Sequence, residues 1–351
     1  MLDLIGEANS AALFGLLGGI VLGLAARIGR FCTLGAIEDW LYSSDDRRMR
    51  MWGVAIGTAV IATHLLMSNG ILAASDIAYL DRVWNPIATI IGGLMFGYGM
   101  ALSGNCGYGA LARLGGGDLR SLIIVVVMGL SAYFVMSGPL AHVRVWLFSV
   151  EEGATTSQGL SGLLETRAGV APLVTGFAVG VAIFAASLAS RPMLRSASHI
   201  FWGVVVGLAI VSGWLGTAWI AANGFAVEPV ESHAFAAPIG DTIIYAMTAS
   251  GNALSFSVGS VCGVLIGAVL GSYSKGHFRW EACEDPRELR RQIAGAALMG
   301  PGAVLAVGCS VGQGLSAFSV LAFSAPVAFV SIVLGAMIGL KQLISGFQLA
   351  R

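Results

Sequence analysis

The sequence predicts an all-α polytopic membrane protein with about nine transmembrane helices, short re-entrant half helices and an inverted internal repeat. Of the 351 residues, 56% are hydrophobic and only 11% are charged. A soluble domain carries about 25% charged residues, so a soluble fold is excluded. Apolar runs of about 20 residues, each long enough to cross a bilayer, follow one another between short polar loops. We therefore expect a single transmembrane domain over residues 1–351, embedded in a lipid bilayer.

Nine apolar runs give the predicted crossings. They cover residues 11–27, 51–68, 87–104, 121–138, 172–189, 199–217, 256–273, 292–309 and 325–345. Four glycine-rich apolar pieces beside them are too short to cross, at residues 33–43, 107–116, 241–250 and 310–323. Irregular backbone at membrane depth is tolerated only where it is buried in protein or lines a cavity. We expect these short pieces to be half helices along a transport path.

Lysine and arginine set the predicted orientation. Basic residues gather in the loops around residues 27–50, 113–120, 191–195 and 275–291, and these loops alternate with longer, mostly acidic ones at 69–86, 139–171 and 218–241. By the positive-inside rule the basic loops are cytoplasmic, so the N-terminus is expected outside and the C-terminus inside. Residues 1–10 contain no Lys or Arg, which does not fit a cleavable signal. The net charge of zero argues against a nucleic-acid partner.

A glycine-rich motif with a central cysteine occurs twice. Cys106 and Cys309 lie 203 residues apart, and each has glycines at the same distances before and after it. The same offset aligns Glu38 with Asp241 and Tyr42 with Tyr245, in the short stretches 35–43 and 239–247. An odd number of crossings would turn the second copy upside down. We expect repeat A over about 1–150, a linking helix over about 172–189, and repeat B over about 199–351.

Three cysteines are the candidate substrate-path residues. Cys32, Cys106 and Cys309 share the form Cys-x-x-Gly, and each follows an apolar run and precedes a short helix. The N-terminus of such a helix presents unpaired N–H groups and the positive end of its dipole, which favours an anion. A thiol adds a weak S–H donor and a soft sulfur, and it stays neutral in apolar surroundings. The alternative is that free cysteines are small buried hydrophobic residues.

Other polar and sulfur-containing residues have two interpretations. Asn105 and Gln313, beside the repeated cysteines, and Asn252, at a break before the seventh run, are possible amide donors into the path or caps of a broken helix. Cys262 begins a small-xxx-small face and is expected to be structural. Cys283 lies in a charged loop and is expected to be a surface thiol.

Neither an enzyme nor a cofactor is predicted. The sequence has no phosphate-binding loop, and its five cysteines form no CxxC pair. Two alternatives to anion transport stay open. One is a membrane thiol-disulfide oxidoreductase, which needs cysteines that can pair. The other is a soft-metal or selenium-compound permease, although Cys-x-x-Gly without other ligands is a poor metal site.

Across its whole length the chain resembles the YeeE/YedE family of bacterial inner-membrane proteins. The resemblance rests on Arg27-Ile-Gly-Arg-Phe-Cys32-Thr-Leu-Gly-Ala, on Ser103-Gly-Asn-Cys106-Gly-Tyr-Gly-Ala-Leu-Ala-Arg-Leu-Gly and on Gly308-Cys309-Ser-Val-Gly-Gln-Gly-Leu-Ser. It implies uptake of thiosulfate or a related sulfur compound across the inner membrane. The implied path passes three cysteines, which match Cys32, Cys106 and Cys309.

The resemblance extends to partners. Some members occur with a TusA-like sulfur carrier. Because no carrier domain follows Arg351, such a partner is expected to be a separate cytoplasmic protein. Sulfate lacks the soft terminal sulfur of thiosulfate, so we expect discrimination against it.

Overall fold

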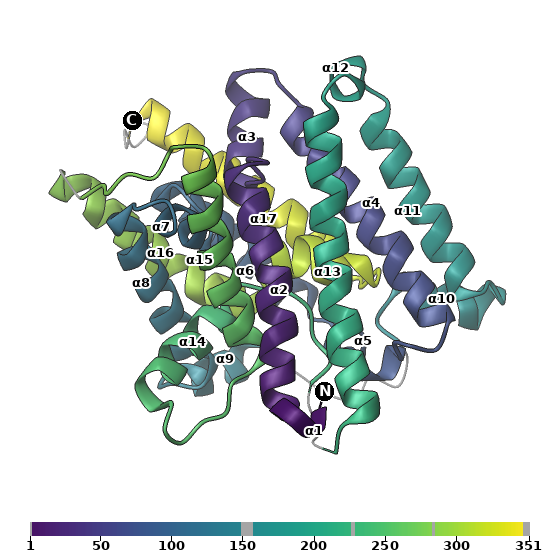
Figure 1. Ribbon diagram of the computed structural model, residues 1–351. Coiled ribbons are helices and arrows are strands. Elements are labelled where there is room, and N and C mark those ends of the chain that lie inside the picture. Colours follow the sequence, from purple (N-terminus) through teal and green to yellow (C-terminus); the bar gives the residue numbers. More distant parts are fainter. Residues whose placement is uncertain (1, 149–156, 226–228, 283–284, 347–351) are drawn as a thin grey trace.

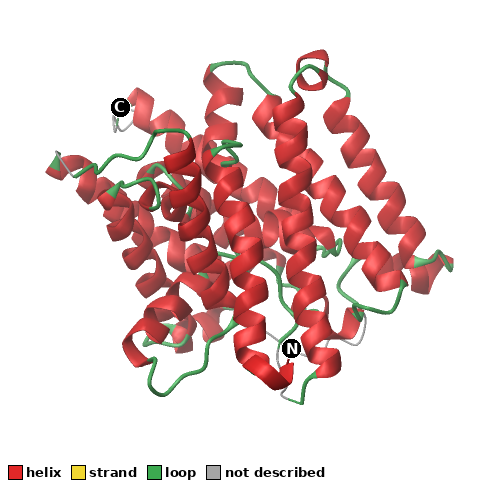
Figure 2. Ribbon diagram, in the orientation of Figure 1, coloured by secondary structure: helices red, strands yellow, loops and turns green. Residues whose placement is uncertain are grey.

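The computed structural model describes residues 2–148, 157–225, 229–282 and 285–346, and within them every regular element is a helix (Figures 1 and 2). In chain order the elements are α1 (Leu2–Ile5), α2 (Glu7–Arg27), α3 (Thr33–Tyr42), α4 (Arg47–Ser68), η1 (Ala74–Asp76), α5 (Ala78–Asp81), α6 (Pro86–Ser103), α7 (Gly107–Leu114), α8 (Leu119–Met136), α9 (Ala141–Leu147), α10 (Leu160–Ala168), α11 (Pro172–Leu188), α12 (Arg191–Leu194), α13 (Ala197–Asn223), α14 (Ala237–Thr248), α15 (Phe256–Ser274), α16 (Pro286–Leu305), η2 (Gly312–Ala317) and α17 (Ser324–Ser345). The predicted all-α membrane fold is confirmed.

Each predicted apolar run lies largely on a helix. Among the described residues, seven helices are long and apolar enough to cross a membrane: α2, α4, α6 together with α7, α8, α13, α15 and α17. The other two runs fall on α11, which has 17 residues, and on α16, whose first turns are charged. The number of nine crossings therefore stays a prediction. The four short pieces correspond to α3, α7, α14 and the helix that contains η2.

The boundary between α6 and α7 shows how a half helix is made. Pro86 stands in the first turn of α6, and the side chain of Asn85 caps that helix by accepting from the N–H of Ala88 at 3.1 Å. The helix ends at Gly104, whose φ of 76° a side-chain-bearing residue rarely adopts. The chain then turns through Asn105 and starts α7 after Cys106. The glycine therefore separates a spanning helix from a short one.

The spanning helices pack across the two halves of the chain. α2 packs against α15 and α4 against α13, so each of these contacts joins one predicted repeat to the other. The crossing of α2 and α15 is formed by glycines, because a Cβ on Gly263 or Gly267 would overlap the backbone of Leu16 or Ile20. The predicted small-residue face that begins at Cys262 is thus confirmed as a close helix contact.

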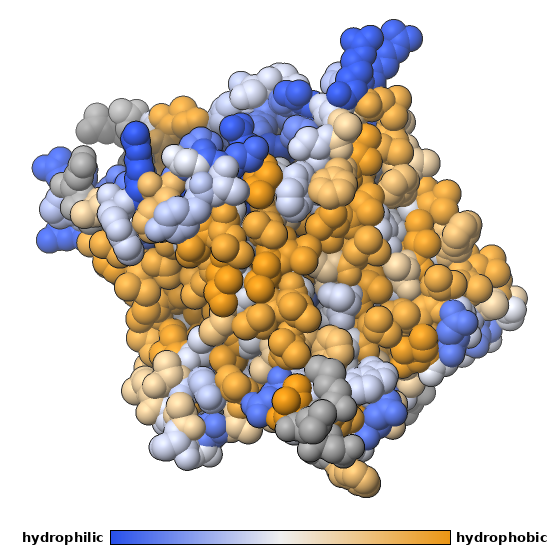
Figure 3. Space-filling view, in the orientation of Figure 1, coloured by the Kyte–Doolittle hydropathy of each residue, from blue (hydrophilic) through white to orange (hydrophobic). Residues whose placement is uncertain are grey.

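The surface carries an apolar belt between two polar ends. On the face shown in Figure 3, hydrophobic residues form a broad band, and hydrophilic residues gather above and below it. The connections α3–α4, α11–α13 and α15–α16 lie on the same side as the C-terminus, whereas α9, α14 and the N-terminus lie on the opposite side (Figure 1). The two ends of the described chain therefore lie on opposite sides of the belt.

One non-helical segment enters the interior ahead of α14. In this segment the hydroxyl of Ser232 donates to the carbonyl of Ile210 at 2.7 Å. The backbone carbonyl of His233 accepts a hydrogen bond from the hydroxyl of Ser316, also at 2.7 Å. His233 and Phe235 are fully buried. These bonds hold the backbone of Phe235 in the middle of the molecule, beside the second cysteine motif.

Candidate functional site

All three predicted path cysteines occupy the same position in a short helix. Each is the residue that precedes the first turn, at the start of α3, of α7 and of the helix that contains η2. The carbonyl of Cys32 accepts from Ala36 N at 3.1 Å, and those of Cys106 and Cys309 accept from Ala110 N and Gln313 N at 2.8 Å each. The shared sequence pattern therefore reflects a shared local structure, in which a cysteine caps a half helix.

The sulfur atoms of two of them are also held by the backbone. Cys106 Sγ accepts from the N–H of Gly109 at 3.4 Å, and Cys309 Sγ accepts from Gly312 N and Phe235 N at 3.4 Å each. A thiol that accepts N–H bonds at its sulfur keeps its own S–H free to donate elsewhere. Cys32 makes no such bond, and its side chain is half-buried, whereas Cys106 and Cys309 are buried.

The glycine three residues after each cysteine makes room for another residue. A Cβ on Gly109 would stand 3.3 Å from the carboxamide oxygen of Asn105. A Cβ on Gly312 would stand 3.2 Å from Ala234 Cβ and 3.4 Å from the hydroxyl of Tyr79. At Gly35 the guanidinium of Arg48 occupies that place. The recurring glycine is therefore a packing requirement at the first turn of each short helix.

The structure brings the three cysteines together in the interior. Cys106 is close enough to interact electrostatically with both Cys32 and Cys309. Aromatic rings enclose this place: Phe235 and Tyr108 stack with centroids 5.3 Å apart, and the Tyr108 hydroxyl donates to the carbonyl of Leu22 at 2.6 Å. Three loops far apart in sequence thus bring Cys106 near both other cysteines, of which Cys32 is only half-buried, and we call these three residues the cysteine cluster.

The amide residues beside the cysteines differ in what they contact. Asn105 is buried, with its carboxamide over the first turn of α7. Gln313 uses its amide within the protein: Nε2 donates to the carbonyls of Ala306 and Val307 at 2.8 and 2.9 Å, and its oxygen accepts from Ser324 at 3.2 Å. Gln313 thus caps the end of α16, which is the second of its two sequence interpretations.

Asn252 lies away from the cysteine cluster. It is exposed, and its amide donates to Thr248 Oγ1 at 2.7 Å. It lines a surface hollow of about 780 Å³ together with Asp241, whose carboxylate accepts the hydroxyl of Tyr133. Cys262 is half-buried on α15, and Cys283 lies outside the described residues.

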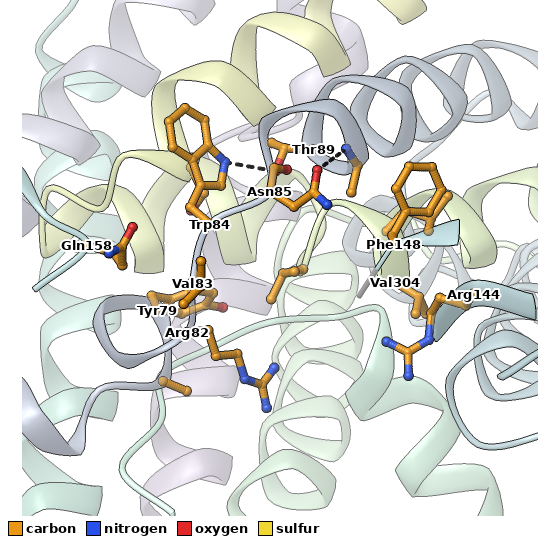
Figure 4. A pocket seen from close by; sticks show the side chains of 15 residues that line it. Tyr79, Arg82, Val83, Trp84, Asn85, Thr89, Arg144, Phe148, Gln158 and Val304 are labelled. Carbon is orange, nitrogen blue, oxygen red and sulfur yellow. Dashed lines mark hydrogen bonds between the residues drawn. The ribbon is translucent and has the colours of Figure 1, made fainter. Parts of the chain in front are cut away.

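A second pocket adjoins the cluster on the side of the N-terminus. It lies between α5, the start of α6, α9 and the end of α16 (Figure 4). Arg82 and Arg144 lie at one border of the pocket and Trp84 and Asn85 at another. Tyr79 belongs to this pocket, and its hydroxyl also reaches the surroundings of Gly312 and Cys309. The side chain of Tyr79 therefore separates the pocket from the cysteine cluster.

Basic residues on the opposite side are largely engaged in ion pairs. Arg48 binds Asp39 at 2.9 Å, and Arg47 binds Asp45 at 2.6 Å. The hydrogen bond from Arg47 lowers the pKa of the Asp45 carboxyl to about 2, so this carboxylate stays charged in the neutral range. Arg48 also stands over Gly35, in the first turn of the helix that follows Cys32, so one of these charges lies at the helix of a path cysteine.

Sequence reasoning missed three groups at the cluster: the N–H of Phe235, the hydroxyl of Tyr79 and the hydroxyl of Ser310. The 203-residue offset between the repeats could have indicated Phe235, because Phe235 is the residue that aligns with Cys32. Tyr79 lies on a short helix in a loop that the hydropathy pattern leaves unstructured. Ser310 has no distinguishing sequence context beyond its place after Cys309.

The difference in burial predicts a difference in reactivity. In a Cys262→Ser/Cys283→Ser background, N-ethylmaleimide should modify Cys32 at least about 10-fold faster than Cys106 or Cys309, because access limits the reaction of a neutral buried thiol. Mass spectrometry of peptides after a short pulse measures the three rates. The same pulse on denatured protein is the control and should modify all three alike. Equal rates in the folded protein would contradict the described burial.

Comparison with known proteins identifies the family of the chain. A family model described as sulphur transport matches residues 28–338. A protein named thiosulfate transporter TsuA from Spirochaeta thermophila is 25% identical over 329 residues, covering 92% of this chain and 96% of its own length. A protein of the same name from Escherichia coli is 25% identical over 347 residues, covering 93% of each chain. The three cysteine motifs all lie within the matched residues, and the chain belongs to the sulphur-transport family.

Proposed function

We propose that the protein takes up thiosulfate, or a closely related sulfur compound, across the bacterial inner membrane past Cys32, Cys106 and Cys309. The carrying observation is the cysteine cluster, in which three cysteines from separate loops, each at the start of a short helix, lie near one another. The relatives named as thiosulfate transporters, which match almost the whole chain, support the substrate class.

The chemistry of the cluster suits a soft dianion. Thiosulfate carries a polarisable terminal sulfur and three oxygens, and it must lose water to enter a buried path. Neutral S–H donors and the N–H groups of helix first turns replace part of that water. Because no thiol brings a full positive charge, each contact is weak enough for the ion to leave, as conduction requires. We therefore assign the three cysteines as successive contacts along one path.

The orientation follows from the loops. The basic connections lie on one side of the apolar belt, and this favours a cytoplasmic C-terminus and an N-terminus outside. The pocket beside Tyr79 then opens toward the outside, and Cys32, at the start of α3, lies nearer the inside. A separate TusA-like sulfur carrier would meet the protein on the cytoplasmic side.

The packing of the halves supports the inverted repeat. The 203-residue offset pairs α2 with α13, α4 with α15, α6 with α16 and α8 with α17. Exchanging the two copies therefore turns the contact between α2 and α15 into that between α13 and α4, and the contact between α6 and α17 into that between α16 and α8. All four contacts are present. Such exchange is expected of two copies related by a two-fold axis in the membrane plane, with a substrate site at their interface. Cys106 and Cys309 then occupy equivalent positions, and Cys32 has Phe235 as its counterpart.

The alternatives receive less support. In the described part of the chain no three His, Cys, Asp or Glu side chains gather in a way that could hold a metal ion, which disfavours a soft-metal permease. The sulfurs of Cys106 and Cys309 are both engaged by backbone N–H groups. A cycling disulfide would have to break these contacts, which disfavours a thiol-disulfide oxidoreductase.

Counterflow in proteoliposomes tests the proposal. Vesicles that contain the purified protein and unlabelled thiosulfate should accumulate external ³⁵S-thiosulfate, and protein-free vesicles should not. Excess external thiosulfate should suppress this signal, and sulfate should not, since it lacks the terminal sulfur. Absence of counterflow with folded protein would overturn the proposal. So would a counterflow signal that selenite or Cu(I) suppresses and thiosulfate does not. A mass tag that reveals a disulfide during turnover would favour the oxidoreductase instead.

A further inference from the structure

We propose that the hydroxyls of Ser310 and Tyr79 bind the oxygens of the substrate, each beside one thiol of the cysteine cluster. This inference rests on the proposed function and names which further residues recognise the anion. Ser310 would serve the contact at Cys106, and Tyr79 the contact at Cys309.

Ser310 is a buried hydroxyl whose only neighbour of suitable chemistry, among the described residues, is the weak acceptor sulfur of Cys106. Its exposed fraction is 0%, and its Oγ has no hydrogen bond among the described residues. It lies beside the sulfur of Cys106, although it follows Cys309 in sequence. A buried hydroxyl without a partner is costly, and native structures generally avoid it. A ligand at the cluster would supply the missing acceptor.

Neighbouring serines differ from Ser310 in this respect. Ser316 and Ser319 belong to the same segment and are equally buried, with 0% exposure. Ser316 donates to the carbonyl of His233 at 2.7 Å, and Ser319 donates to the carbonyl of Ser316 at 2.7 Å. Backbone carbonyls thus satisfy these two hydroxyls, whereas the hydroxyls of Ser310 and of Thr33, which follows Cys32, have no hydrogen bond among the described residues.

Tyr79 provides a similar hydroxyl at the other repeated cysteine. A Cβ placed on Gly312 would stand 3.4 Å from the Tyr79 hydroxyl and 3.8 Å from Cys309 Sγ, so both atoms face the same small space. The ring packs edge-on against Trp214, with centroids 6.4 Å apart, which fixes its direction. Because Tyr79 also borders the pocket in Figure 4, an ion that arrives from that pocket would meet this hydroxyl first.

The pairing of a thiol with a hydroxyl matches the shape of the substrate. A thiol is a weak donor and suits the soft terminal sulfur, whereas an O–H group donates strongly to a charged oxygen. One of each at a contact would distinguish thiosulfate from an ion that offers only oxygens or only sulfur. The cluster would thereby contact both the terminal sulfur and the oxygens of thiosulfate.

The two repeats divide this task unequally. The position aligned with Ser310 in the first copy is Gly107, where a Cβ would contact Met128 and lie 2.9 Å from the carbonyl oxygen of Phe235. The loop of Cys106 therefore has no room for a hydroxyl of its own. The second copy supplies it through Ser310, so the contact at Cys106 is built from both copies.

Transport kinetics of Ser310→Ala and Tyr79→Phe test the proposal. In proteoliposomes each variant should raise the KM for thiosulfate by about 10-fold or more, the effect expected for loss of a hydrogen bond to a charged group. The maximal rate per folded protein should change much less. Ser310→Cys keeps a donor, although a weaker one on a slightly larger side chain, so its KM should lie between those of wild type and Ser310→Ala. The Ser310→Cys variant can be used for the same measurement if Ser310→Ala does not fold.

Matched controls separate recognition from stability. Ser10→Ala removes an equally buried hydroxyl that donates to the carbonyl of Gly6 at 2.8 Å, and Tyr98→Phe removes a hydroxyl bonded to Gln342 at 2.7 Å. Both should leave KM within about 2-fold of wild type while lowering the unfolding temperature. Wild-type KM in Ser310→Ala and Tyr79→Phe would overturn the assignment. This outcome would leave the proposed function intact as long as the wild-type protein transports thiosulfate and the cysteine variants do not.

Discussion

Replacement of Cys106 with alanine should abolish growth on thiosulfate as the sole sulfur source. The substitution removes the S–H donor at the centre of the cluster and the sulfur that accepts the N–H of Gly109. Loss of a donor to an ion in a buried site costs about 10- to 100-fold, and the unpaired N–H adds to this. We expect uptake of ³⁵S-thiosulfate by cells to fall by at least that factor, with Cys309→Ala giving the same result.

Two further substitutions make the result specific. Cys106→Ser keeps a capping oxygen and a donor but loses the soft sulfur, so partial uptake is expected. Cys262→Ala removes a half-buried thiol from α15 and should grow as wild type. Normal growth of Cys106→Ala at wild-type protein levels would show that the path does not depend on this thiol.

The substitution Gly263→Val should prevent the protein from folding. A Cβ at this position would overlap the carbonyl oxygen of Leu16 and come within 2.9 Å of Gly19 Cα, so backbone rather than a movable side chain is in the way. Ordinary overpacking of a core costs about 1–3 kcal/mol, and here two helices must separate along their whole contact. Size-exclusion chromatography of the solubilised protein should show little or no monodisperse species.

The adjacent residue provides the control for this prediction. Cys262→Val introduces the same residue on the same helix, but it replaces a half-buried side chain rather than a glycine that is pressed against the backbone of α2. It should yield monodisperse protein with an unfolding temperature close to that of wild type. A folded Gly263→Val protein would mean that α2 and α15 are less tightly packed than described.

The fold could be predicted largely from hydropathy, and the reason is the bilayer. A crossing needs a long apolar run, so the runs that became α2, α4 and α13 are evident in the sequence. The small elements α5, α9 and α10 were not predicted, because they lie in polar loops without apolar periodicity. The buried segment ahead of α14 was also missed, since its position depends on bonds of Ser232 and His233 with distant helices.

The candidate site could be predicted in part. The repeated motif indicated the cysteines, and the structure shows that each of them starts a short helix, while their role as a path stays a prediction. The backbone donors and the hydroxyls beside them come from other parts of the chain, and no local pattern reports such meetings. Gln313 illustrates the limit: its type fits a substrate ligand or a cap equally, and only its contacts with Ala306 and Val307 distinguish the two.

The contact between α2 and α15 has a consequence for synthesis of the chain. α2 leaves the ribosome first, but its glycine-lined face finds its partner only when α15 has been made, roughly 230 residues and about 10–45 s later at 5–20 residues per second. During this interval the first half has inserted without the surface that completes it. The insertion machinery or neighbouring lipid must therefore cover that face, and a photocrosslinker at Leu16 in a nascent chain stalled before Phe256 should capture lipid or the insertion machinery.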